Sequence, residues 1–221
     1  MLGREKDSRN HPSKALLAHY RKLFERYGPG HNAVQWSSLE AQQRRFNVLA
    51  DLVDAREHVL DVGCGLGDML PYLREQHEFT GDYTGLDQVP AFIDYARERY
   101  SRDVRASFQL ADVAALSELP ACDCVLISGL FNNQLDARVD NTEWLRTTIR
   151  LAFSAARRAV AFNALSTWVG GEDSGLFYVE PDVLAHWCAE HLTRRLILRH
   201  DYNAPAALGV PVDFTICLFK G

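Results

Sequence analysis

The chain has 221 residues, 47% of them hydrophobic and 24% charged, with a formal net charge of −5. This length suits one α/β domain with a small elaboration, and the apolar content excludes a disordered chain and a disulfide-stapled miniprotein. The acidic balance disfavours a nucleic-acid binder, whose surface would be basic.

The first 53 residues have the pattern of a polar tail and two helices. Residues 1–13 are polar and charged, so we expect a disordered tail. Apolar residues recur at helical spacing over residues 14–27, and Gly28 ends that helix. Ser37-Ser38-Leu39-Glu40 has the Ser-x-x-Glu pattern of a capping box, which predicts that a second helix begins there. We expect residues 14–53 to form a helical cap and residues 54–221 to form the main domain.

From residue 54 onward, short apolar strands alternate with helices. This alternation predicts an α/β fold with a mostly parallel sheet and helices on both faces, and the last two strands, joined by a loop alone, should pair antiparallel. The strands are expected at residues 58–62, 83–86, 108–110, 124–128, 159–164, 195–199 and 214–219, and the helices at 67–76, 90–100, 141–157 and 181–191.

Neither a metal site nor a membrane segment is expected. The five cysteines have no Cys-x-x-Cys pair, and His186 and His191 are five residues apart rather than four. No apolar stretch is long enough to span a bilayer, and the N-terminus lacks the apolar core of a signal peptide. We therefore expect a cytoplasmic protein.

The strongest motif follows the first strand of the main domain. It reads Asp61-Val62-Gly63-Cys64-Gly65-Leu66-Gly67-Asp68, with three glycines at every second position, where the backbone can approach a ligand closely. The spacing is G-x-G-x-G and not the G-x-G-x-x-G of the dinucleotide fingerprint. Asp61 would repel a diphosphate but suits an ammonium group.

Carboxylates also follow the next two strands. Asp87, 20 residues after Gly67, either accepts both hydroxyls of a ribose or caps the helix that begins at Pro90. Asp112 either accepts from an adenine amino group beside the Val113 amide or is a turn aspartate. Open α/β sheets bind ligands at the carboxyl ends of their strands, so these residues are expected to lie together.

The set of strand ends resembles the class I S-adenosylmethionine-dependent methyltransferases. The matching segments are DVGCGLGD, GLD, ADV and CDCVLISGLF, and HYRKLFERYG, SGLFN, AFN and RHDY are similar to a bacterial subgroup of small methyltransferases mostly without assigned substrates. The resemblance implies a Rossmann-like seven-stranded sheet with one antiparallel strand, S-adenosylmethionine as cofactor and S-adenosylhomocysteine as product.

The resemblance also implies which residues bind the cofactor. Asp61 and the glycines would flank the methionine part, Asp87 would hold the ribose, Asp112 and Val113 the adenine, and Ser128 would lie under the sulfonium. The full set of cofactor residues expected from the matching segments is Asp61, Gly63, Cys64, Gly65, Gly67, Asp87, Gln88, Asp112, Val113 and Ser128.

The N-terminal helices either fold over the cofactor as a lid or are ordinary packing helices. Trp36 is a further cofactor candidate, because an aromatic face attracts a sulfonium cation. Arg45 either holds the cofactor carboxylate or lies on a solvated helix face. Tyr20, Tyr27 and His31 are candidates for the substrate side of such a lid.

Other substrate-side candidates lie on the strand-end loops. Phe131, Asn132 and Asn133 follow the fourth strand, and Asn163 and Tyr178 are weaker candidates. His200 either acts as a general base oriented by Asp201 or is a solvated turn histidine.

The sequence thus predicts a methyltransferase for a small-molecule O, N or S nucleophile. The alternatives are a non-catalytic S-adenosylmethionine-binding or interaction protein on the same fold, and a nicotinamide-dependent oxidoreductase, which the glycine spacing disfavours. No nucleic-acid or membrane partner is expected, and the sequence leaves a monomer and a homodimer both open.

Overall fold

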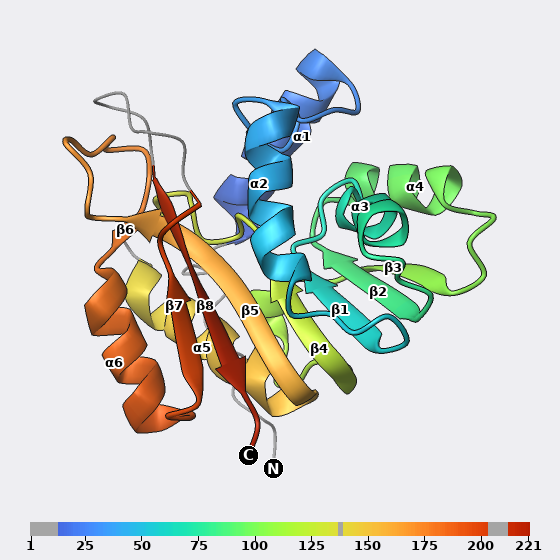
Figure 1. Cartoon of the computed structure of the whole chain (residues 1–221). Helices are drawn as coiled ribbons and strands as arrows, with labels where there is room; N and C mark the ends of the chain where they lie inside the picture. Colours follow the sequence, from blue (N-terminus) through green and yellow to red (C-terminus); the bar gives the residue numbers. More distant parts are fainter. Residues whose placement is uncertain (1–12, 137–138, 203–211) are drawn as a thin grey trace, which may run out of the picture.

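The computed structural model describes residues 13–136, 139–202 and 212–221 (Figure 1). Of the expected disordered tail, residues 1–12 lie outside the described residues, and Ser13 already begins the first helix. The described chain is built around one mixed sheet. In chain order its elements are α1 (Ser13–Tyr27), α2 (Leu39–Ala50), β1 (His58–Val62), α3 (Met69–Gln76), β2 (Asp82–Asp87), α4 (Pro90–Arg99), β3 (Ala106–Leu110), the 3₁₀ turn η2 (Val113–Ala115), β4 (Cys122–Ile127), α5 (Asn141–Ala155), β5 (Ala156–Ser166), β6 (Tyr178–Val179), α6 (Pro181–His191), β7 (Leu196–Arg199) and β8 (Asp213–Phe219).

The sheet has the strand order β3-β2-β1-β4-β5-β8-β7, and β6 pairs with β5 beside this path. The pairs from β3 to β5 are parallel, whereas β8 is antiparallel to both β5 and β7. The predicted α/β fold with one antiparallel strand is therefore confirmed. The strand order reverses between β1 and β4, which places the ligand-binding crevice at their carboxyl ends.

Successive side chains along each central strand point to opposite faces of the sheet, and they contribute to two apolar cores, one on each face. Leu60 and Val125 point into the core beneath α5 and α6, whereas Val59 and Leu126 point into the core beneath α2 and α3. This period of two, with both faces buried, is why the central strands are apolar almost throughout.

Several boundaries differ from those predicted. The helix after the glycine motif begins at Met69 rather than residue 67, because Gly67 has a φ of +77°, which is not helical. The cap of α2 is Ser38 and not Ser37: the Ser38 side chain accepts a hydrogen bond from the Ala41 amide. The short strand β6 was not predicted, because two residues carry no periodicity.

The N-terminal helices pack on the main domain through aromatic contacts. Phe24 of α1 lies 5.6 Å from the ring of Phe92 in α4, edge to face. Leu17 and Tyr20 pack against the same small cluster around Phe92. Figure 1 shows α1 and α2 at the upper end of the sheet, away from the C-terminus.

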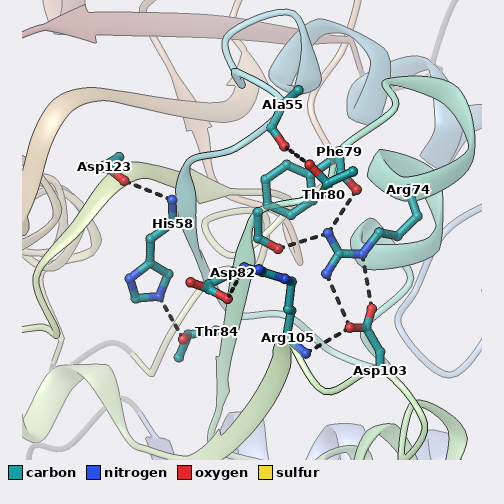
Figure 2. A network of polar contacts seen from close by, with 11 residues as sticks. Ala55, His58, Arg74, Phe79, Thr80, Asp82, Thr84, Asp103, Arg105 and Asp123 are labelled. Atoms are coloured by element: carbon teal, nitrogen blue, oxygen red, sulfur yellow. Dashed lines mark hydrogen bonds and ion pairs between the residues drawn. The ribbon is translucent and has the colours of Figure 1, made fainter.

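A separate network of polar contacts holds the loops that lead into β2 and β3, at the amino ends of these strands (Figure 2). Arg74 of α3 donates to the backbone carbonyls of Phe79 and Gly81 and forms a two-pronged ion pair with Asp103. Its guanidinium carbon lies 4.7 Å from the centre of the Phe79 ring. These contacts fix the loops that lead into β2 and β3 and so set where both strands begin.

Candidate functional site

A cavity of about 430 Å³ lies at the carboxyl edge of the sheet, beneath the N-terminal helices. Its size falls in the range of small-molecule sites. The predicted cofactor and substrate residues that line it are Tyr20, Trp36, Arg45, Asp61, Gly63, Cys64, Gly65, Asp87, Gln88, Asp112, Val113, Ser128, Asn132 and Asn133. Residues far apart in the sequence thus meet where the strand order reverses.

The glycine turn after β1 is held in place by β2. The amides of Gly63 and Cys64 both donate to the carbonyl of Leu86, at 2.8 and 2.9 Å. Gly63 has a φ of +77°, and a Cβ atom there would lie 2.9 Å from Leu130 Cδ1. A larger residue would therefore be strained and crowded at this turn. Burial raises the pKa of the Cys64 thiol well above its ordinary value, so this cysteine stays protonated and is no nucleophile.

Asp61 is a buried carboxyl group that faces the site without a cationic partner among the described residues. It is 2% exposed, and its Oδ2 accepts a hydrogen bond from the Tyr83 hydroxyl. Its Oδ1 has no hydrogen-bond partner there. Burial, with a smaller contribution from the charge of Asp87, raises the pKa of Asp61 to about 7, although the Tyr83 hydrogen bond opposes this rise. Such a group is suited to a ligand ammonium, which would supply the missing charge and donor.

Asp87 ends β2 and is bound by backbone amides. Its carboxylate accepts from Gly65 and Val89, both at 2.9 Å, so it braces the glycine turn and the entry to α4 together. Burial raises its pKa to about 6, and these amide bonds limit the rise. Asp112 accepts from the Ala114 amide at 3.1 Å and caps η2, which begins at Val113. Asp112 thus forms the local turn contact that was one of its two expectations. Asp87 does not cap α4, because the N-cap of that helix is Val89 and no side chain bonds there. Both residues also line the cavity.

The end of β4 is a tight turn with buried polar atoms. Gly129 has a φ of +71°, and its amide donates to Asn163 Oδ1 at 2.7 Å. Ser128 Oγ and Asn132 Oδ1 are buried and have no hydrogen-bond partner among the described residues. Buried polar atoms of this kind are costly unless a ligand or water satisfies them.

The N-terminal helices close the cavity through two polar contacts with the main domain. The Tyr20 hydroxyl accepts from Asn133 Nδ2 at 2.8 Å, and burial raises the pKa of Tyr20 to about 12. Arg45 of α2 is paired with Asp213 of β8, so its guanidinium is already engaged and does not lie on a solvated face. Asp213 therefore competes with the cofactor carboxylate that was the expected partner of Arg45.

Several predicted site residues lie elsewhere. Phe131 is fully buried in the core against Trp144 and Phe162, because the turn at Gly129 directs it inward. Tyr27 is 48% exposed at the end of α1, and Tyr178 lies on β6, where its hydroxyl accepts from the Asp173 amide.

Three further predicted residues, Asn163, Gly67 and His31, are not among the residues that line the cavity. Asn163 supports the Gly129 turn, and Gly67 is packed so closely that a Cβ atom there would meet the ring of Phe108 at 2.8 Å.

The expected pairing of His200 with Asp201 does not form. His200 Nε2 lies 2.9 Å from Ser166 Oγ, and its ring contacts Trp168, whereas Asp201 is bonded to Arg199 at 2.7 Å. Neither His200 nor Asp201 lines the cavity. The Arg199 guanidinium, with its fixed charge and planar fork, is the partner that Asp201 takes.

Sequence reasoning missed much of the cavity wall. The residues that were missed are mainly apolar and are spaced in the sequence like core residues, so no local pattern indicates that they line a cavity. Gln42 and Asp68 are the exceptions, since Asp68 adjoins the glycine motif and accepts a hydrogen bond from Gln42. The missed residues include Leu16, Val34, Gln42, Phe46, Leu66, Asp68, Phe92, Leu130, Trp144, Leu165, Leu176 and Val212.

The comparisons with known proteins agree with this geometry. The sequence model of a family described as a methyltransferase domain matches residues 59–151. The matched segment runs from β1 into α5 and contains the glycine motif. This match favours a methyltransferase over the nicotinamide-dependent oxidoreductase that the sequence also left open. No protein of curated function matches the sequence.

Solved structures of this methyltransferase fold resemble the chain over most of its length. The magnesium protoporphyrin IX methyltransferase ChlM of Synechocystis PCC 6803, with bound SAM, is 13% identical, with a TM-score of 0.60 over 95% of this chain and 93% of that chain. The N-methyltransferase NodS of Bradyrhizobium japonicum WM9, in complex with S-adenosylhomocysteine, is 15% identical, with a TM-score of 0.64 over 91% and 97%. The [4+2]-cyclase SpnF is 18% identical, with a TM-score of 0.51 over 69% and 58%.

Two further features bear on ligands and location. In the described ranges, no group of three or more His, Cys, Asp or Glu side chains is placed to hold a metal ion. None of the helices in the part of the chain that the structure describes is both long and apolar enough to cross a bilayer.

Proposed function

We propose that this methyltransferase transfers a methyl group from S-adenosylmethionine to a small-molecule acceptor. The observation that carries the proposal is the cavity itself: four carboxylates and a glycine turn line one part, and two helices cover it. A cavity of this size and enclosure admits a small molecule or a single protruding group.

The residues present fit the cofactor. Asp61 would hold the ammonium of the methionine part, which would give its buried carboxyl the cation it lacks. Asp87 would accept the ribose hydroxyls at the end of β2, and Asp112 with the Val113 amide would hold the adenine. When bound, the cofactor supplies a methyl carbon activated by the sulfonium.

The protein would contribute position and the exclusion of water. Residues 14–53 serve as a lid in this proposal, because Tyr20 and Trp36 line the cavity from α1 and the loop that follows it. Holding the acceptor in line with the methyl carbon and away from water is the main catalytic requirement. Burial keeps the Tyr20 hydroxyl protonated at neutral pH, so Tyr20 acts as a hydrogen-bonding group rather than a base.

Two measurements test the proposal. Titration calorimetry with S-adenosylhomocysteine should show micromolar binding, and NADH should not bind. A screen of thiols, phenols, amines and carboxylates with S-adenosylmethionine should yield S-adenosylhomocysteine with at least one class. If S-adenosylhomocysteine fails to bind, the proposal is wrong.

Binding without turnover across the whole screen would instead support a second function. The specific observation in its favour is the likeness to SpnF, whose structure is described as that of a [4+2]-cyclase, so this fold does not always imply methyl transfer. In that case the chain would bind the cofactor without transferring its methyl group.

A further inference from the structure

Trp36 lies against the turn that ends β4. A Cβ atom on Gly129 would be only 2.8 Å from Trp36 Cζ2, so the indole ring rests almost directly on the Gly129 backbone. The turn beneath it is rigid, because the Gly129 amide is bonded to the buried side chain of Asn163. Trp36 therefore forms part of the cavity wall at the strand end where the acceptor would meet the methyl group.

Arg45 lies over the same indole ring. Its guanidinium carbon is 4.6 Å from the ring centre of Trp36, in the geometry of a cation–π contact. Its Nη1 donates to the carbonyl of Ala41 at 2.7 Å, and its Nη2 is paired with Asp213 Oδ2. The Arg45 side chain is only 13% exposed.

Asp213 gives this arginine a fixed partner on the sheet. Its side chain is fully buried at the start of β8, and burial raises its pKa while the charge of Arg45 opposes the rise. If Arg45 turned toward a ligand carboxylate, the buried Asp213 would lose its ion pair with Arg45, and breaking a buried ion pair is strongly unfavourable. The pair thus ties α2 to β8 and leaves the guanidinium face on Trp36.

We infer that Arg45 and Asp213 are positioning residues that hold Trp36 against the Gly129 turn, so that its ring forms a fixed wall for the methyl acceptor. The placement of Trp36 follows from the contacts alone, whereas the acceptor part of the inference rests on the proposed function. It also differs from the reading in which Arg45 binds the carboxylate of the cofactor.

The chain contains a matched pair for comparison at the opposite edge of the sheet. Figure 2 shows Arg74 beside Asp103 and Phe79. Arg74 forms an ion pair with Asp103, and its guanidinium carbon lies 4.7 Å from the ring centre of Phe79. Arg74→Lys therefore removes the same kind of planar contact without touching the cavity. Arg45→Lys keeps the charge opposite Asp213 but loses the planar stacking, and Asp213→Asn keeps the volume but removes the charge.

The experiment uses the full chain labelled with 5-fluorotryptophan. Fluorine NMR resolves the four tryptophans, and Trp36→Phe assigns the Trp36 resonance. In Arg45→Lys and Asp213→Asn we expect this resonance to shift or broaden while the other three stay in place, and Arg74→Lys should leave it unchanged. Calorimetry with S-adenosylhomocysteine should give a Kd within about twofold of wild type for all three variants.

An acceptor identified in the screen adds a kinetic test. Its KM should rise at least fivefold in Arg45→Lys, whereas the KM for S-adenosylmethionine should stay within twofold. An unmoved Trp36 resonance in both pair variants would overturn the inference, and so would a tenfold loss of S-adenosylhomocysteine affinity in Arg45→Lys. If the wild type does not bind S-adenosylhomocysteine while Trp36 still responds, the positioning role stands and the proposed function fails.

Discussion

Replacing Asp61 with Asn should make the protein more stable at alkaline pH and weaken its cofactor site. Asp61 is buried with one hydrogen bond, from Tyr83, and no counter-cation among the described residues. Asn has nearly the same shape, can still accept from Tyr83, and carries no charge that must be desolvated.

The magnitude follows from the pKa of Asp61, which rises from 3.8 to about 7 in the folded protein. Between these values the folded state keeps a proton that the unfolded state has lost, so the stability of the wild type falls as the pH rises through this window. At about 1.4 kcal/mol for each tenfold change in proton affinity, the full cost above pH 7 is about 4 kcal/mol. Asp61→Asn should therefore match the wild type near pH 4 and exceed its unfolding free energy by about 2–4 kcal/mol at pH 8.

Urea unfolding at pH 3, 4, 6 and 8 measures this difference. Asp123→Asn is the control of opposite sign, because hydrogen bonds from the His58 amide and Arg157 lower the pKa of Asp123. It should lose stability at pH 8 and not near pH 3. At pH 8, S-adenosylhomocysteine should bind Asp61→Asn at least tenfold more weakly than wild type. A variant no more stable than wild type at pH 8 would refute the reasoning that Asp61 is a buried, uncompensated acid.

Three further predictions concern the rest of the site. Asp87→Ala should weaken S-adenosylhomocysteine binding by about 1.5–3 kcal/mol for each charged hydrogen bond lost, and an unchanged Kd in calorimetry would remove Asp87 from the site. Gly85→Ala should destabilise the fold by about 1–3 kcal/mol in urea unfolding, because its Cβ would meet Cys64 Sγ at 2.8 Å; full stability would show that the packing there is loose. Tyr20→Phe should speed amide hydrogen exchange in α1, since Asn133 loses its partner, and unaltered exchange would mean that this bond does not secure the helix.

Local patterns predicted the fold well because they reflect local physics. The apolar runs of β1 and β4 predict buried strands, and Pro90 and Pro181 stand at the first positions of α4 and α6. The glycine turn, Asp87 and Asp112 were found because each follows a strand directly. Their meeting in one cavity required only the general rule for open sheets.

The substrate side was predicted less well, because its residues are decided by contacts between distant segments. The sequence offered Phe131 equally with Asn132, whereas in the structure Asn132 lines the cavity and Phe131 is buried in the core. For Arg45 the sequence left a ligand carboxylate or solvent as partners. The actual partner, Asp213, lies 168 positions later in the chain, which no local spacing indicates.

By itself, then, the sequence determined the class of fold, the order of its elements and the edge of the sheet that holds the cavity, since each depends on periodicity and on residues adjacent to strand ends. Only the tertiary structure decided which side chains of the N-terminal helices enter the cavity and which charges are paired before any ligand arrives. Those outcomes depend on burial and on partners brought together by packing. A carboxylate such as Asp61 or Asp213 acquires its character from the groups that surround it in space.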